Sequence, residues 1–286
     1  MLEDGSLAFV EIAGQRVSRV DGSGKRTLLA HVPGGPNGLA MGPDGCLYIC
    51  NNGGLRWDRQ DGSIRPLRAD ENGTDGRIER LDYTTEKLEC LYDRCDGVPL
   101  GAPNDLTFDQ AGGFYFTDTG KNLEWGRQHG RIFHALADGS KIRQIAAPMV
   151  TPNGIGLSPD GRSLYVAETE TARLWRFAIS SPGVIVSEPY PSPHGGRFHS
   201  CMSGFHRFDS LAVEMDGSIS VCTLVSGGVA TFSPDGRMFD WKELPDLFCT
   251  NICVGGEDGR TAYITLSMTG RIATMRWERP GMVLSC

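Results

Sequence analysis

The segment Pro-Asn-Gly-Ile-Gly-Leu-Ser-Pro-Asp-Gly-Arg-Ser-Leu-Tyr-Val-Ala-Glu, residues 152–168, contains the pattern from which the fold can be predicted. A leading Asn is followed by a short apolar run, an Asp-Gly pair and a second apolar run. Asp-Gly adopts the positive backbone φ that a tight hairpin turn requires, and short runs rich in β-branched and aromatic residues are typical of strands. The segment therefore predicts two antiparallel strands joined by a tight turn.

The same pattern occurs five times along the chain. In every copy the leading Asn or Asp lies seven residues before the turn, and these leading residues are Asn37, Asn104, Asn153, Asp209 and Asn251. They are 67, 49, 56 and 42 positions apart, and the first interval is long because residues 51–75 read as a polar insertion loop. Four-stranded blades of β-propellers recur at roughly 40–50 residues. Each copy is therefore interpreted as one propeller blade.

A sixth, partial copy opens the chain. Asp4-Gly5 precedes an apolar run at residues 6–12, but the position seven residues before Asp4 lies upstream of Met1. The repeats thus predict an all-β, six-bladed β-propeller, one domain over residues 1–286, whose first blade lacks its inner strand at the N-terminus. We favour the interpretation that this strand is encoded upstream. The alternative is that the C-terminal residues Met282, Val283 and Leu284 close the ring.

Composition excludes several classes of partner. The 28 basic and 35 acidic residues give a net charge of −7, and Lys and Arg form no cluster, which argues against nucleic acid or an anionic membrane as a partner. The chain has no apolar run of roughly 20 residues and begins without a signal-peptide pattern, so a cytoplasmic location is expected. Nine cysteines are read as reduced thiols. The oligomeric state is left open.

The leading residues of the repeats form the candidate site. The inner strand of each blade runs along the central channel, so the five side chains are expected at a single mouth. Amide and carboxylate oxygens without His or Cys suit hard cations such as Ca²⁺, Mg²⁺ or Mn²⁺. Asp209 supplies the one carboxylate of the set. The alternative interpretation is that each Asn caps the turn at the start of its strand.

Three motifs carry a resemblance to a known family. Pro-Asn-Asp at 103–105, Pro-Asn-Gly-Ile-Gly-Leu at 152–157 and Asp-Ser-Leu-Ala-Val at 209–213 resemble the SMP-30/gluconolactonase/luciferin-regenerating-enzyme family. The resemblance implies a six-bladed propeller with one divalent cation, Ca²⁺ being expected and Mn²⁺, Mg²⁺ or Zn²⁺ left open. It implies Asn153 and Asp209 as metal ligands, with Asn104 approaching the metal and contacting the substrate. The family's first-blade Glu ligand would lie upstream of Met1.

The resemblance also implies a reaction. A divalent-metal-dependent hydrolase would open a lactone ring, that of a small-molecule sugar-acid lactone, with Asp209 as general base or as nucleophile. Many sugar-lactone hydrolases of the family have Arg where this chain has Ala102, which weakens the case for a polyhydroxylated substrate. The alternatives are a metal-dependent esterase or organophosphatase of the same fold, and a non-catalytic ligand-binding propeller.

Other conspicuous residues have two interpretations each. His206 lies three residues before Asp209 and is predicted to contact the substrate, the alternative being an ordinary loop histidine. His194 and His199 lie in the Pro- and Gly-rich segment 191–204, which is expected to be either a lid over one face or a solvent-exposed loop. Cys50, Cys222 and Cys253 are predicted to fill the interfaces between sheets.

Overall fold

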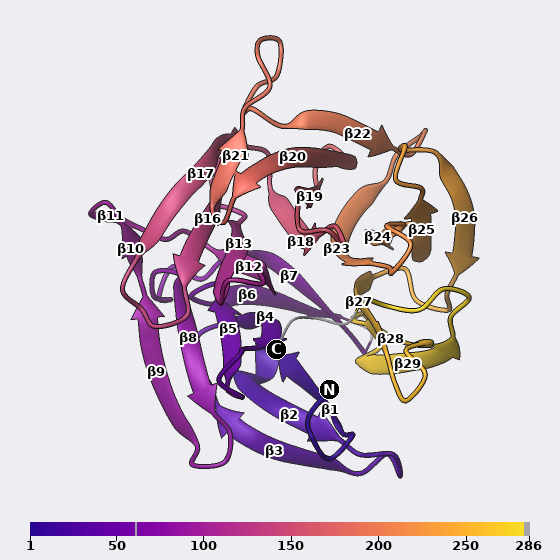
Figure 1. Cartoon of the computed structure of the whole chain (residues 1–286). Helices are drawn as coiled ribbons and strands as arrows, with labels where there is room; N and C mark the ends of the chain where they lie inside the picture. The colour runs from indigo at the N-terminus through magenta and orange to yellow at the C-terminus, as the bar shows by residue number, and fades with distance from the viewer. Residues whose placement is uncertain (61, 283–286) are drawn as a thin grey trace.

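The computed structural model describes residues 1–60 and 62–282, and within them six sheets of three to five strands are arranged in a ring around a central channel, with three further two-stranded ribbons (Figure 1). The prediction of an all-β, six-bladed propeller is confirmed. Blade 1 comprises β1 (Leu7–Glu11), β2 (Arg16–Val20) and β3 (Arg26–His31), and blade 2 comprises β4 (Pro36–Met41), β5 (Leu47–Asn51), β8 (Arg77–Asp82) and β9 (Lys87–Tyr92). A turn of 3-10 helix (Ile12–Gly14) joins β1 to β2.

The remaining blades follow in chain order. Blade 3 comprises β12 (Pro103–Phe108), β13 (Gly113–Asp118), β16 (Gly130–Leu136) and β17 (Ile142–Met149). Blade 4 comprises β18 (Pro152–Leu157), β19 (Ser163–Glu168), β20 (Arg173–Ser181), β21 (Val184–Val186) and β22 (Arg197–Cys201). Blade 5 comprises β23 (Arg207–Val213), β24 (Ile219–Leu224), β25 (Gly228–Phe232) and β26 (Met238–Glu243), and blade 6 comprises β27 (Cys249–Gly255), β28 (Thr261–Leu266) and β29 (Arg271–Arg276).

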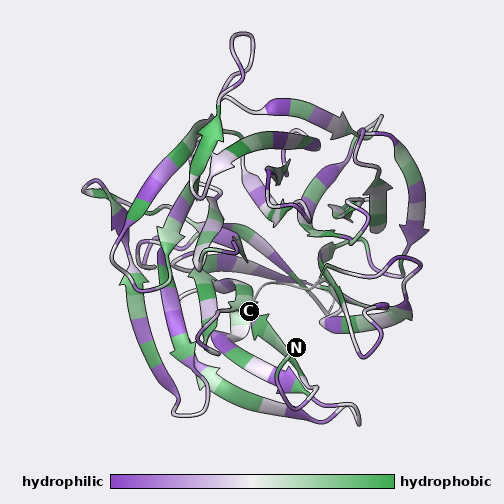
Figure 2. Cartoon of the chain, in the orientation of Figure 1, coloured by the Kyte–Doolittle hydropathy of each residue, from purple (hydrophilic) through white to green (hydrophobic). Residues whose placement is uncertain are grey.

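The core lies between successive blades. Five clusters of buried apolar residues fill the interfaces from blade 1 to blade 6, the interface between blades 2 and 3 being rich in aromatic rings such as Tyr48, Phe114 and Phe116. Hydrophilic residues recur along the outer strands β9 and β26 (Figure 2). As predicted, Cys50 and Cys222 are fully buried in these interfaces. The chain has no helix, within residues 1–60 and 62–282, that is long and apolar enough to cross a membrane.

Each inner strand from blade 2 to blade 6 contains a β-bulge near its start. In β18, Asn153 and Gly154 together lie opposite Ala167 of β19, and the leading residues of β4, β12 and β23 are bulged in the same way; in β27 the extra residue is Thr250, directly before Asn251. A bulge bends the strand and re-aims the side chains of the two residues that face one partner. The repeated spacing in the sequence thus corresponds to a repeated distortion at one end of the channel.

Glycine in two of these bulges allows neighbouring inner strands to approach closely. A Cβ atom on Gly154 would lie 2.6 Å from the backbone nitrogen of Leu211 and 2.7 Å from the carbonyl oxygen of Asp209 in β23. A Cβ atom on Gly38 would lie 2.4 Å from the carbonyl oxygen of Asn104 in β12. Both contacts are with backbone atoms, which have little room to move. The absence of a side chain at these positions therefore sets the distance between blades at the channel mouth.

The first blade contains three strands, as the partial repeat predicted. β1 pairs with β2 on one edge, and its channel-facing edge pairs with no strand within residues 1–60 and 62–282. All five side chains of β1 are partly exposed. At the other end of the chain, the amide of Met282 donates to the carbonyl of Val213 in blade 5. Val283 and Leu284, which were considered for closing the ring, lie outside the described residues.

The two insertions are hairpins. Residues 51–75, expected as a loop, contain the antiparallel strands β6 (Leu55–Gln60) and β7 (Ser63–Ala69). Residues 119–130 contain β14 (Asn122–Leu123) and β15 (Gly126–Arg127), and a short ribbon of β10 (Arg94–Cys95) and β11 (Val98–Pro99) lies between blades 2 and 3 in the chain. Both insertions connect the second strand of a blade to the third. They therefore extend from the end of the ring at which the inner strands begin.

Segment 191–204 lies at the outer edge of blade 4 and is no lid, and although half of it is exposed, the expectation that His194 and His199 are solvent-exposed was wrong. Its second half forms β22, which pairs with β20 at the outer edge of blade 4. His194 packs edge-on against Trp175 at a centroid distance of 4.5 Å, and His199 packs in the same way against Tyr165 at 5.1 Å. The aromatic residues of blade 4 bind this segment against the sheet, a contact that its Pro-rich and Gly-rich composition does not reveal.

These two histidines predict a pH dependence of stability. Burial lowers the pKa of both His194 and His199, so the unfolded chain, with its higher histidine pKa near 6.5, binds protons more readily than the folded chain. The free energy of unfolding should therefore fall as the pH is lowered through and below about 6.5. Thermal melts at pH 7.5 and 5.5 check this: the H194Q/H199Q variant should lose less stability than the parent, whereas the exposed-site control H31Q should behave like the parent.

A second prediction concerns the bulge glycines. Gly154→Ala places a methyl group against the backbone of β23 and should reduce the free energy of unfolding by about 1–3 kcal/mol, the usual cost of overpacking. Gly22→Ala is the matched control, because a Cβ atom there meets nothing within 4 Å. Urea unfolding followed by circular dichroism measures both. Equal midpoints for the two variants would contradict the role given to Gly154.

Candidate functional site

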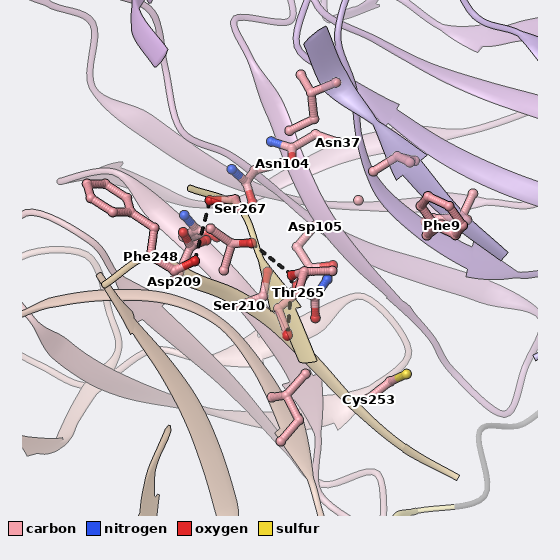
Figure 3. Close-up of a pocket in the computed structure, with 18 of the residues that line it drawn as sticks. Phe9, Asn37, Asn104, Asp105, Asp209, Ser210, Phe248, Cys253, Thr265 and Ser267 are labelled. Atoms are coloured by element: carbon pink, nitrogen blue, oxygen red, sulfur yellow. Dashed lines mark hydrogen bonds between the residues drawn. The ribbon is translucent and has the colours of Figure 1, made fainter. Parts of the chain in front are cut away.

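A cavity of about 1460 Å³ occupies the centre of the ring and follows the inner strands from their first residues to their last, where Val213 and Val254 line it. Its wall includes the leading residues of all five full repeats, namely Asn37, Asn104, Asn153, Asp209 and Asn251. Figure 3 shows Asn37, Asn104 and Asp209 around the same space, each from a different blade. The structure therefore brings together the residues that the repeat predicted to meet.

Asn153 has one side-chain atom with a partner and one without. Its Nδ2 donates to the hydroxyl of Thr169 at 3.0 Å, which fixes the orientation of the amide group. Its Oδ1 is buried and has no hydrogen-bond partner in the part of the chain that the structure describes. The backbone of β18 is also fixed to β13 of the preceding blade, because Thr117 Oγ1 donates to the carbonyl of Asn153 at 2.6 Å. A buried acceptor without a donor is costly, and a bound cation would satisfy it.

Asp209 is the acidic member of the ring. Burial raises the pKa of its carboxyl to about 8, the Asn153 amide opposes this shift, and the nearby Asp105 carboxylate adds to it. Arg207, two residues away, is engaged by Glu170 at the rim. The carboxyl is thus surrounded by protein that favours its neutral form, an environment that a divalent cation would reverse.

Asp105 is a second buried carboxyl at this site, and it was missed in the sequence. It is 8 % exposed, and burial raises its pKa to about 6 although the hydroxyl of Ser210 and the amide of Leu106 oppose the shift. The Leu106 amide donates to its Oδ1 at 2.9 Å. A signal was present: Asp105 occupies the bulge position that is Gly in blades 2 and 4, so a carboxylate at this point of the repeat had to enter the channel.

The donor set fits a hard cation. Within residues 1–60 and 62–282 no group of three or more His, Cys, Asp or Glu side chains is arranged to hold a metal, so a site here depends on amide oxygens. The available atoms are the free Oδ1 of Asn153, the Asp209 carboxylate and the amide oxygen of Asn104, which are oxygen ligands of the kind that Ca²⁺, Mg²⁺ and Mn²⁺ bind. Glu11 is engaged elsewhere, since its carboxylate accepts from Arg16 and Ser18, each at 2.6 Å.

Ion pairs occupy the rim of the cavity. Arg127 and Arg207 both contact the carboxylate of Glu170, Arg127 at 2.9 Å. Lys121 contacts Asp75 at 2.8 Å. Ala102 lines the cavity beside them, its amide held by the buried carboxylate of Asp118 at 2.7 Å. The charged side chains around the mouth are therefore paired with one another across blades.

Two sequence-predicted residues have other surroundings than expected. His206 is not one of the residues that line the cavity: its ring contacts the hydroxyl of Ser226 at 2.5 Å and the carbonyl of Ser203 at 3.0 Å. A substrate contact by His206 therefore finds no support in the geometry. Cys253 was expected inside a sheet interface, but its side chain is exposed to the cavity, because the bulged β27 faces the open space beside β1. That expectation was wrong.

Comparisons with known proteins place these features in context. A family model described as the SMP-30/Gluconolactonase/LRE-like region matches residues 1–268. A gluconolactonase of Zymomonas mobilis is 27% identical over 244 residues, covering 82% of this chain and 61% of the relative. A lactonase drp35 of Staphylococcus haemolyticus is 26% identical over 236 residues, covering 82% of this chain and 64% of the relative. The chain thus spans about three fifths of the length of the curated relatives it matches.

A solved structure shows the shared fold. Regucalcin from Agrobacterium tumefaciens, described as a calcium-binding protein, superposes with a TM-score of 0.75 over 99% of this chain and 89% of its own. At 18% sequence identity the likeness concerns the fold. The superposition includes all six blades.

The geometry of Asn153 and Asp209 predicts metal-dependent stability. Adding Ca²⁺, Mn²⁺ or Mg²⁺ to metal-stripped protein should raise the melting temperature, since a ligand at 100 times its Kd stabilises the folded state by about 2.7 kcal/mol. Asn153→Ala and Asp209→Asn should abolish the increase, whereas His206→Gln should retain it. Differential scanning calorimetry measures the shift. A melting temperature unaffected by all three ions would exclude the site.

Proposed function

The chain belongs to the SMP-30/gluconolactonase/LRE-like family, and on this basis we propose that it is a hydrolase that opens a lactone ring with the help of a divalent cation at the channel mouth. The observation that carries the proposal is the buried, unpartnered Oδ1 of Asn153 beside the half-buried carboxyl of Asp209, both in the wall of one cavity. The names of the curated relatives, gluconolactonase and lactonase, support the same reaction class.

Three residues would hold the cation. Asn153 offers an oriented amide oxygen, Asp209 a carboxylate and Asn104 a further amide oxygen, and all three line one cavity. Ca²⁺ is proposed because oxygen ligands alone are present, with Mn²⁺ and Mg²⁺ as alternatives; Zn²⁺ is the weakest of the four because it favours nitrogen and sulfur ligands. When bound, such a cation is a Lewis acid that polarises the carbonyl group of an ester.

Asp209 is proposed as the residue that activates the attack. As general base, its carboxylate accepts a proton from a water molecule that attacks the acyl carbon, and the proton is then delivered to the ring oxygen as the acyl C–O bond breaks. As nucleophile, it attacks the acyl carbon, the ring C–O bond breaks with protonation of the ring oxygen, and the mixed acyl anhydride so formed is hydrolysed by water. Its place on the channel wall, with the Asn153 amide beside it, suits either role. A single turnover in ¹⁸O-labelled water tests the nucleophilic route: label in Asp209 means that water attacked the Asp209 carbon of the anhydride, which general-base catalysis does not produce.

The remaining chain residues position the substrate and limit water. Asn37 and Asn251 present amide groups on the same rim, where they can donate to ring or substituent oxygens of a small molecule. The rim ion pairs narrow the mouth above them. A non-catalytic ligand-binding propeller is the second candidate, because a bound cation alone does not require turnover.

The test is lactone hydrolysis by the parent and two variants. Asp209→Asn should retain the fold by circular dichroism and lower kcat by about 10²–10⁴, the range expected for the loss of a general base. His206→Gln, whose ring lies outside the cavity wall, should keep parental kcat. A pH-stat assay with δ-gluconolactone and δ-valerolactone in the presence of Ca²⁺ gives the rates. Metal-induced stabilisation with no hydrolysis of any lactone would favour the non-catalytic alternative.

A further inference from the structure

A hairpin bridges the mouth of the cavity. We define the strap as β6 and β7 together, residues 55–60 and 63–69. Figure 1 shows it running from blade 2 across the central opening toward blade 6. Near its tip, Ser63 and Ile64 share a small pocket with Met268 and Thr269 in the turn that follows β28. The strap thus extends from blade 2 to the vicinity of blade 6, two blades that are not consecutive in the chain.

The strap has an apolar face and a charged face. Its register places Leu55 opposite Ala69 and Trp57 opposite Pro66, and residues directly opposite in an antiparallel pair point to the same side. All four line the cavity. On the other side, Asp58 lies opposite Arg65 and Arg56 lies opposite Arg68. Of these four residues, Arg65 and Arg68 also border the cavity, whereas Arg56 and Asp58 do not. A hairpin with this alternation covers a space with its apolar side and meets water with its charged side.

Contacts from blade 3 hold the strap in this position. The Asn122 side-chain amide donates to the carbonyl of Leu67 at 3.4 Å, and the guanidinium of Arg68 lies 3.7 Å from the carboxylate of Glu124. Arg68 also contacts Glu71 at 2.9 Å. The strap is therefore supported at both ends and along one side, so its apolar residues face the cavity as a formed surface.

Floor and roof of the cavity differ in chemistry. The floor carries the polar side chains of the ring, with Asp209 and Asn104 among them. The roof carries Leu55 and Trp57 of the strap, and the wall beside Asp209 includes Phe248 (Figure 3). At the rim, Lys121 is paired with Asp75, Arg127 and Arg207 share the carboxylate of Glu170, and Ala102 contributes only a methyl group. A ligand that fits both surfaces is polar at one end and apolar at the other.

We propose that the strap selects lactones that carry an apolar substituent, the cyclic esters of hydroxy fatty acids, over polyhydroxylated sugar-acid lactones. The proposal rests on the proposed function and names its substrate class. The ester group lies on the polar floor, and the alkyl chain packs beneath Trp57 and Leu55. Water adds to the acyl carbon, the acyl C–O bond breaks, and the ring oxygen takes the proton, giving a hydroxy fatty acid.

Three lactones of equal ring size test the selection in the full chain with Ca²⁺. δ-Valerolactone has no substituent, δ-decanolactone has a pentyl chain and δ-gluconolactone has hydroxyl groups. We expect kcat/KM for δ-decanolactone to exceed that for either of the others by at least tenfold, through a lower KM, because each buried methylene contributes to binding. Equal or higher kcat/KM for δ-gluconolactone would overturn the proposal and leave the lactonase function intact. Inertness toward all three would overturn the lactonase function itself.

Variants of the strap test whether its apolar side chains determine which lactone is preferred. Trp57→Ala and Leu55→Ala should each reduce the ratio of kcat/KM for δ-decanolactone to that for δ-valerolactone at least fivefold, and Trp57→Phe should retain most of it. Arg56→Ala is the matched control on the charged face of β6, since Arg56 does not line the cavity, and it should keep the parental ratio. Thermal melts confirm that each variant is folded. A ratio unchanged in both apolar variants, or reduced equally in the Arg56 control, would remove the strap from substrate selection.

Discussion

Close approach of the inner strands at the channel axis is the constraint on which the other features of this propeller depend. Gly38 and Gly154 lie against the backbone of the next blade, at distances where any Cβ atom would collide. The bulges near the starts of the inner strands then turn polar side chains toward the axis. Because the strands are so close, these side chains line one cavity, where Asn153 is buried and Asn37, Asn104, Asp209 and Asn251 are half-buried. The site is a direct result of the packing of the ring.

This packing also disfavours negative charge on the carboxyl groups at the channel mouth. Two carboxyl groups, the buried Asp105 and the half-buried Asp209, lie in one cavity wall, and burial raises the pKa of each. The two rim arginines share the single carboxylate of Glu170, which balances one of their two positive charges. A positive ion beside Asn153 would favour the ionised form of Asp209 and satisfy the free amide oxygen together. The same arrangement that destabilises the metal-free site therefore favours a cation within it.

The sequence predicts the ring and its polar mouth because both arise from local patterns. The Asn-to-turn spacing fixes a hairpin in each blade, and repetition places equivalent residues at equivalent points. Features that depend on contacts between distant segments were not predictable in this way. His194 and His199 are buried by aromatic residues of blade 4, and the strap became a hairpin although its composition is that of a polar loop. Asp105 was overlooked because the bulge that turns it inward is a property of the backbone.

The seam between blades 6 and 1 has a consequence for the motions of the molecule. Apolar clusters join each blade to the next from 1 through 6, whereas the described contact across the seam is that of the Gly256 amide with the sulfur of Met1 at 3.3 Å. Local unfolding of the ring should therefore begin at this seam, where the fewest apolar contacts must be broken. Amide protons of β1 and β29 would exchange with solvent sooner than those of blades 3 and 4. Asn153 and Asp209, the proposed metal ligands, belong to blades 4 and 5 and therefore lie away from the seam.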